Sequence, residues 1–162
     1  MKKFLLLFIL LINLFAFNWY GNIHWIKSYN IAQKLAKKNH KLMLIEIAGI
    51  KCPPSKYLSK YVYSDKKISE FINKNFIPVF YFIQQNSIPK NIKKHFNGVT
   101  PTIIFFKPNG KAFYILTGAR NKNEFLKVLK TMIKQYNKKF KEASINSPKP
   151  IWLQIPKNKG KE

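Results

Sequence analysis

The sequence predicts an α/β fold in which a central mixed β-sheet is flanked by helices. Two nearly unbroken apolar runs, residues 42–47 and 76–83, have the length and composition of buried strands. The segment between them has helical features, and a helical crossover joins parallel strands. The run 76–83 is apolar enough to be covered on both faces, which favours a central strand. The runs 103–106 and 111–117 lie on either side of a Pro-Asn-Gly turn and are expected to form a hairpin.

The helical spacing of apolar residues predicts the elements that surround these strands. An amphipathic helix is expected to begin near Trp25 and to end near Asn39. Further helices are expected over residues 57–62, after an N-cap at Ser64-Asp65, within residues 88–96, and over residues 123–136. With 162 residues, of which 46% are hydrophobic, the chain can bury one core of ordinary size, so we expect a single domain.

The single cysteine, Cys52, follows the first strand run at a point where a helix is expected to begin. Pro53 and Pro54 suit the first turn of a helix, because an N–H group missing there costs no hydrogen bond. The helix dipole and the unpaired N–H groups favour a thiolate at this position, and Lys51 and Lys56 add positive charge beside it. Cys52 is therefore a candidate nucleophile. The alternative is a small buried residue, since free cysteines are often buried.

These residues, together with Thr100-Pro101 ahead of the hairpin, resemble the motifs of the thioredoxin superfamily. The resemblance covers residues 25–133 and implies a thioredoxin-like fold. It also implies that Cys52 matches the nucleophile of the superfamily and that Glu46 matches a buried carboxylate behind it. Pro101 matches the cis-proline that lies beside the bound substrate.

Two departures from the superfamily pattern bear on the chemistry. Ser55 stands where the second cysteine of a Cys-x-x-Cys motif is usual, and Lys51 stands where a tryptophan is usual. No internal disulfide can form at this site, so the resemblance implies exchange through one thiol. Cys52 would attack a disulfide, Ser55 would hydrogen-bond the thiolate, and an external thiol would resolve the mixed disulfide.

The same resemblance places a substrate groove beside the cysteine. We expect Thr100 and Pro101 to hold a bound chain in an extended conformation, with Pro53 and Pro54 also in contact with it. The predicted function is thiol–disulfide exchange by an exported protein that acts through Cys52 on mixed disulfides of proteins or small thiols. The alternative is a redox-silent binding module or chaperone that uses the groove beside the cis-proline. Accessibility of the thiol distinguishes the two functions.

Glu46 is an acidic residue within an apolar strand run. Burying a carboxylate there is costly unless the group has a partner or a role. Burial should raise its pKa toward the range in which it can exchange protons with a thiol, so Glu46 joins Cys52 and Ser55 as a candidate catalytic residue. The alternative is that Glu46 pairs with a lysine.

Both ends of the chain differ in composition from the middle. Residues 1–17 combine a basic start with an apolar stretch too short to span a bilayer, which is typical of a secretory signal peptide. Residues 18–137 are expected to form the domain, and the Lys- and Pro-rich residues 138–162 a flexible tail. We expect an exported, periplasmic protein, with a tether formed by an uncleaved signal anchor as the alternative. Its partners would be exported proteins with disulfides or thiols, or a small thiol.

The formal charge of +24 attracts polyanions, but the composition argues against nucleic acid as a partner. All 30 basic residues except Arg120 are lysine, whereas recognition of bases and phosphates favours arginine. Peripheral attraction to an anionic membrane surface is an alternative to a merely solvated surface. The three histidines lack the spacing of metal ligands, and no phosphate-binding glycine loop is visible, so we expect no metal and no cofactor.

Overall fold

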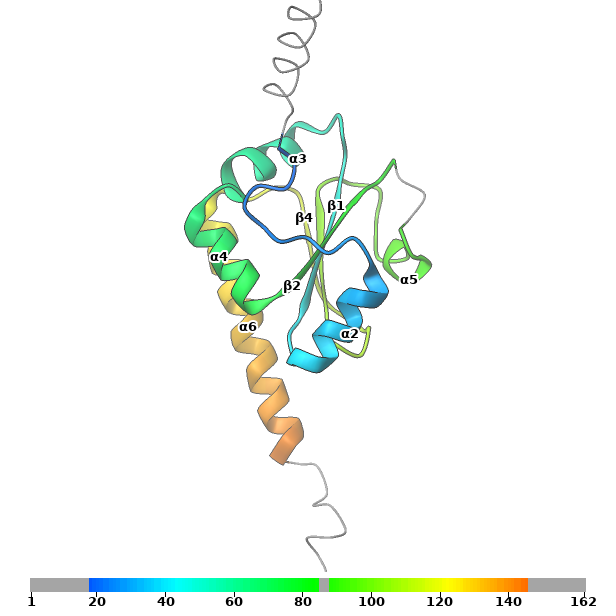
Figure 1. The fold of residues 1–162 in the computed structure, drawn as a ribbon, viewed down its shortest axis with the longest axis vertical. Helices are drawn as coiled ribbons and strands as arrows, with labels where there is room; N and C mark the ends of the chain where they lie inside the picture. The colour runs from blue at the N-terminus through cyan, green and yellow to red at the C-terminus, as the bar shows by residue number, and fades with distance from the viewer. Residues whose placement is uncertain (1–17, 85–87, 146–162) are drawn as a thin grey trace, which may run out of the picture.

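The computed structural model describes residues 18–84 and 88–145. Within these residues, one sheet has the strand order β2-β1-β3-β4 (Figure 1). β1 is parallel to β2, whereas β3 is antiparallel to both β1 and β4, so the predicted mixed sheet is confirmed. The elements in chain order are α2 (Tyr29–Asn39), β1 (Met43–Ala48), α3 (Pro53–Tyr57), the π-helical turn η1 (Leu58–Val62), α4 (Lys66–Asn75), β2 (Ile77–Phe82), α5 (Lys90–Lys93), β3 (Thr102–Phe106), β4 (Ala112–Thr117) and α6 (Lys122–Ile145).

The sheet separates two apolar cores. In Figure 1, α4 and α6 cover one face of the sheet, while α2 and α5 lie on the other side. Along β1, Leu44 belongs to the core under α4 and α6, whereas Met43, Ile45 and Ile47 belong to the core under α2. Because side chains alternate between the faces of a strand, Glu46 shares the face of Leu44. The sheet therefore directs Glu46 toward the side of α3, η1, α4 and α6.

The prediction that residues 76–83 form the central strand is wrong, because β2 lies at an edge of the sheet. Every residue of β2 is nevertheless buried. The segment before α2 runs along the free edge of β2: Ile26 forms an isolated parallel bridge with Val79, and its N–H donates to the carbonyl oxygen of Pro78 at 2.9 Å. An unbroken apolar run thus indicates that both faces of a strand are covered. It does not indicate whether the strand lies at the centre or at the edge of the sheet.

Local capping explains where the helices begin. Asp65 accepts a hydrogen bond from the N–H of Ile68, as expected of the N-cap of α4. The first helix begins at Tyr29 and not near Trp25, because the side chain of Ser28 caps it by accepting from the N–H of Ile31. Trp25 belongs instead to the extended segment that lies along β2.

The closing helix is longer than its apolar pattern predicts. α6 continues to Ile145, so residues 138–145 of the expected tail are helical, and the expected boundary at residue 137 falls inside a helix. The expected signal peptide, residues 1–17, and residues 146–162 of the expected tail lie outside the described residues. Among the helices that are described, none combines the length and the apolar character needed to cross a bilayer.

Candidate functional site

Cys52 lies at the junction between the sheet and the first helical segment after it. The chain leaves β1 through Gly49 and turns back, with the N–H of Cys52 donating to the carbonyl oxygen of Gly49 at 3.0 Å. Cys52 is then the N-cap of α3, and Pro53 and Pro54 occupy the first helical positions, where no N–H is needed. The predicted placement of Cys52 at the start of a helix is therefore confirmed.

Cys52 is half-buried, and its sulfur contacts the loop that precedes β3. Its thiol donates to the backbone carbonyl oxygen of Thr100 at a distance of 3.1 Å. Ser55 is fully buried beside it, and its hydroxyl oxygen accepts from the N–H of Gly49 at 3.2 Å. The serine that replaces the usual second cysteine is thus fixed in place by the turn that leads to Cys52.

The surroundings of Cys52 lower the pKa of its thiol below the ordinary value. Partial burial acts in the opposite direction and raises this pKa, but hydrogen bonds from the Ser55 side chain, the Thr100 side chain and the Ser55 backbone together outweigh it. The carbonyl oxygen of Thr100 binds only the protonated thiol, so the two polar groups of Thr100 favour opposite protonation states. Hydrogen bonds account for the lowered pKa, whereas the exposed, solvent-screened charges of Lys51 and Lys56 do not.

The loop before β3 closes the other side of the site. The Thr100–Pro101 peptide bond is cis, Thr100 is half-buried and Pro101 is buried. The N–H of Gly118 donates to the carbonyl oxygen of Pro101 at 2.8 Å. The turn after β1 approaches this loop so closely that a Cβ atom on Gly49 would lie 2.8 Å from the Thr100 hydroxyl oxygen and 2.9 Å from Cys52 Cβ. Glycine at position 49 is therefore required for the contact between Cys52 and Thr100.

Glu46 lies behind this surface, within β1, with no exposure to solvent. The hydroxyl of Tyr63 donates a hydrogen bond to Glu46 Oε2, whereas the described ion pairs, Lys66–Glu70 and Lys122–Asp65, do not include Glu46. Among residues 18–84 and 88–145, Glu46 therefore pairs with a tyrosine and with no lysine. Burial raises the pKa of Glu46 well above its usual range, and repulsion by the Cys52 thiolate raises it further. Both effects favour the protonated form of Glu46.

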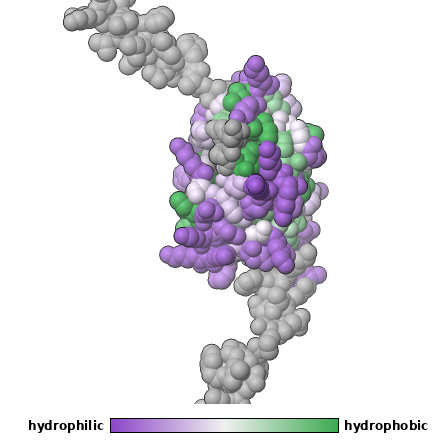
Figure 2. Space-filling view, turned by 90° about the vertical axis from the view of Figure 1, so that its right-hand side faces the viewer, coloured by the Kyte–Doolittle hydropathy of each residue, from purple (hydrophilic) through white to green (hydrophobic). Residues whose placement is uncertain are grey.

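The surface around the thiol is partly apolar. Figure 2 shows a largely hydrophilic face that carries a hydrophobic patch in its upper part. Ile50 and Val99, which belong to the two loops that carry Cys52 and Thr100, are 43% and 47% exposed. Pro53 and Pro54 are exposed as well. Apolar groups next to a nucleophile suit contact with the side chains of a bound chain.

Two residues of the site could not be identified from the sequence. Gly49 holds Ser55 and allows the close approach to Thr100, but its position after a strand indicates only a turn. Tyr63 binds Glu46 from 17 residues away, and no spacing rule links a strand residue to the end of the helix after it. Among residues 18–84 and 88–145, no three His, Cys, Asp or Glu side chains lie together as metal ligands would.

With this geometry established, comparison with known proteins identifies the family. No curated protein matches the chain significantly. A thioredoxin from Thermus thermophilus has 22% sequence identity and a TM-score of 0.60, over 68% of this chain and 87% of that chain. A candidate disulphide-isomerase from Bacteroides thetaiotaomicron has 30% identity and a TM-score of 0.57, over 68% of this chain and 91% of that chain. DsbH oxidoreductase has 16% identity and a TM-score of 0.57, over 70% and 86%. A family model described as a thioredoxin-like domain matches residues 29–133, more than half of the sequence, and the chain therefore belongs to the thioredoxin-like family.

Proposed function

We propose that this protein carries out thiol–disulfide exchange through Cys52 alone. The observation that carries the proposal is the environment of Cys52: the residue is half-buried, and hydrogen bonds from Ser55 and Thr100 lower the pKa of its thiol. A lowered pKa increases the fraction of thiolate at neutral pH, and the thiolate is the attacking species. The 30% identity to a candidate disulphide-isomerase supports the same chemistry.

The reaction has two balanced steps. The Cys52 thiolate attacks one sulfur of a substrate disulfide, so that a bond to Cys52 forms, the substrate S–S bond breaks, and the second substrate sulfur leaves as a thiolate. In this proposal Glu46, whose pKa is raised by burial and by the Cys52 thiolate, supplies a proton to this leaving group. A second thiolate then attacks the substrate sulfur of the mixed disulfide and releases Cys52. One disulfide is consumed and one is formed, so no external oxidant is required.

Substrates of this reaction would be chains with a disulfide or a thiol in an extended segment. In the free protein, the carbonyl oxygen of Thr100 is engaged by the Cys52 thiol. Ionisation of Cys52 removes that donor and frees the oxygen to accept a backbone N–H from a substrate beside Pro101. We extend the proposal to exported proteins and small thiols as substrates in the periplasm, because residues 1–17 have the composition of a signal peptide.

A binding module is the second candidate function. The exposed side chains of Ile50 and Val99 favour it, because apolar groups on a surface loop bind a partner without any need for a thiol. In that case Cys52 would be incidental. The same surface serves both functions, so the chemistry of the sulfur has to be tested directly.

The test incubates the reduced, folded protein with oxidised glutathione and with a disulfide-linked peptide, and follows the protein mass over a range of pH. A mass increase of one glutathionyl or peptidyl group should occur in the wild type, and Cys52→Ser should abolish it. Ser55→Ala is the matched variant: it retains the thiol but loses a hydrogen bond to the thiolate, so its reaction should need a higher pH. A thiol that reacts only after denaturation would establish the binding module instead.

A further inference from the structure

The buried acid of the site has one hydrogen-bond partner in the described structure. Tyr63 donates to Glu46 Oε2, and neither side chain is exposed to solvent. The other carboxyl oxygen, Oε1, has no hydrogen-bond partner among the described residues. The residues paired with Glu46 on the neighbouring strands, Phe80 and Ile103, are both apolar. The orientation of this carboxyl group therefore depends on the phenol of Tyr63.

Tyr63 is held in turn by the segment that precedes α2, residues 18–26, which we call the N-terminal strap. The N–H of Asn22 donates to the carbonyl oxygen of Tyr63 at 3.0 Å. Gly21 has φ +56° and lies so close that a Cβ atom on it would be 2.4 Å from the Tyr63 carbonyl carbon. The ring of Trp25 packs edge-on against Tyr63, with centroids 5.4 Å apart. The strap therefore fixes both the backbone and the ring of Tyr63.

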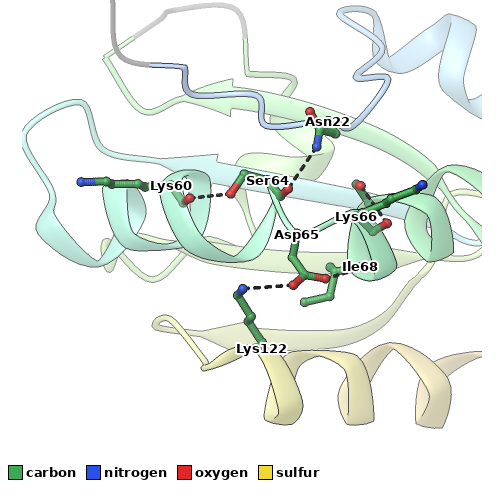
Figure 3. A network of polar contacts seen from close by, with 8 residues as sticks. Asn22, Lys60, Ser64, Asp65, Lys66, Ile68 and Lys122 are labelled. Atoms are coloured by element: carbon green, nitrogen blue, oxygen red, sulfur yellow. Dashed lines mark hydrogen bonds and ion pairs between the residues drawn. The ribbon is translucent and has the colours of Figure 1, made fainter.

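The residues that follow Tyr63 are anchored by the strap and by α6 (Figure 3). Asn22 Nδ2 donates to the carbonyl oxygen of Ser64 at 3.0 Å, and Lys122 Nζ lies 3.0 Å from a carboxylate oxygen of Asp65. Asp65 also caps α4. Three elements thus meet around Tyr63: the strap, the start of α4 and the first turn of α6. A phenol with such anchoring has little freedom to leave the carboxyl group.

We propose that Tyr63 is a positioning residue for thiol exchange, which fixes the carboxyl group of Glu46 behind Cys52 and leaves Oε1 as the oxygen that carries the proton. The inference rests on the proposed function of Cys52. Tyr63 does not touch the substrate; it acts through Glu46. The strap is the part of the fold that maintains the arrangement.

The electrostatic consequence of this contact has a definite sign. Among the described residues, two titratable groups act on Glu46: Cys52, whose thiolate repels the carboxylate, and Tyr63, whose phenol donates to it. The paired strand residues and Trp25 carry no charge. Because a donated hydrogen bond stabilises the ionised carboxyl group, Tyr63 counteracts the effect of burial on the pKa of Glu46. Without the Tyr63 phenol, the pKa of Glu46 should be higher. Glu46 should then release its proton only at higher pH and transfer it to the leaving sulfur more slowly.

The experiment measures the titration of Glu46 in the full chain, by 13C NMR of the glutamate carboxyl carbons, with Glu46→Gln to identify its signal. Tyr63→Phe should shift the midpoint of Glu46 upward by about one pH unit, the effect expected of losing a hydrogen bond to a buried charge. Tyr81→Phe is the matched control, because it removes a buried phenol from the opposite core and should leave the midpoint unchanged. The pH profile of Cys52 alkylation should lose its step for Glu46 in Glu46→Gln and show that step at higher pH in Tyr63→Phe.

An unchanged Glu46 midpoint in a folded Tyr63→Phe protein would overturn the inference. If Tyr63→Phe does not fold, the double variant Tyr63→Phe/Glu46→Gln shows whether the cause is the loss of the hydrogen bond to Glu46. This double variant has no buried carboxyl group at position 46 that would need the hydrogen bond from Tyr63. Folding of the double variant alone supports the role through Glu46, and failure of both variants shows a purely structural tyrosine. Neither the titration of Glu46 nor the alkylation of Cys52 requires a disulfide substrate. If Cys52 forms no mixed disulfide, the proposed function is refuted, but the effect of Tyr63 on the titration of Glu46 can still be measured.

Discussion

Cys52 and Glu46 belong to one candidate site but lie in contrasting regions of the molecule. The first region, the thiol mouth, consists of Cys52, Thr100 and Pro101 with the exposed Ile50 and Val99 at its rim. The second, the acid compartment, consists of Glu46 and Tyr63 under the aromatic rings of Trp25 and Phe80. The mouth is open and made by two loops, whereas the compartment is closed and made by a strand, a helical turn and the N-terminal strap.

The contrast shows how the fold shifts the pKa values of the two acids in opposite directions. At the mouth, several hydrogen bonds favour the ionised form, and they lower the pKa of Cys52 despite partial burial. In the compartment, complete burial raises the pKa of Glu46, and repulsion by the Cys52 thiolate raises it further. Groups with these opposite shifts suit the roles of nucleophile and proton donor at the same pH.

The largest expected effect is a change of chemistry at the mouth. The Ser55 side chain lowers the pKa of the Cys52 thiol, so Ser55→Cys should place two sulfurs close together on the first turn of α3. The variant should form an internal disulfide and reduce a model disulfide substrate in a dithiol-driven reaction, which the wild type should scarcely do. Counting free thiols under oxidising conditions tests this, with Ser55→Ala as the control. Two free thiols in the folded variant would show that positions 52 and 55 do not face each other.

The next largest effect should come from opening the acid compartment. Phe80 is 8% exposed, and its ring packs against those of Trp25, Tyr20 and Phe82. Phe80→Ala should lower the free energy of unfolding by about 3–5 kcal/mol, as measured by urea denaturation. The exposed Tyr114 serves as a control, because Tyr114→Ala should cost less than about 1 kcal/mol. Equal losses in the two variants would contradict a closed compartment.

Glu46 should make the stability of the protein depend on pH. Its folded-state pKa lies above the ordinary value of 4.5, so below pH 4.5 the group is neutral in both states and carries no penalty. As the pH rises from 4.5 toward the folded-state pKa, only the unfolded chain ionises, and the wild type should lose up to about 1.4 kcal/mol per pH unit from this group.

The variant Glu46→Gln isolates this dependence, because its amide oxygen still accepts from Tyr63 but does not ionise. The variant should be more stable than the wild type at pH 7 and nearly equal to it at pH 4. Urea denaturation at several pH values measures the difference. A constant difference between the two proteins over this range would mean that Glu46 titrates as an ordinary exposed carboxyl group.

The smallest effect is expected at the junction that supports the compartment from outside. Asp65 caps α4 and pairs with Lys122, and this hydrogen-bonded pairing holds the pKa of Asp65 below its usual value of 3.8. Asp65→Ala should cost about 1 kcal/mol at pH 7, mainly through the lost cap. Because a carboxyl group with a lowered pKa stabilises only above its unfolded-state value, the cost should shrink below pH 3.8. Lys66→Ala, in an exposed pair, should have almost no effect.

The sequence by itself determined the elements that depend on neighbouring residues. Apolar runs located the strands, Asp65 marked the start of α4, and the Cys52-Pro53-Pro54 order placed the cysteine at the beginning of a helix. These features follow from backbone geometry and from hydrogen bonds within a few residues, so a local pattern contains the information they need. The replacement of the second cysteine by Ser55 is likewise visible in the sequence.

Only the tertiary structure decided which distant groups meet. The edge position of β2 depends on the order in which strands pair, which the burial pattern of a single strand does not contain. The contact of Cys52 with Thr100 spans 48 residues, and the bond from Tyr63 to Glu46 spans 17. Long-range hydrogen bonds arise from the path of the chain through space. The pKa shifts of Cys52 and Glu46 depend on those bonds and on burial, so their directions could be assigned only from the tertiary structure.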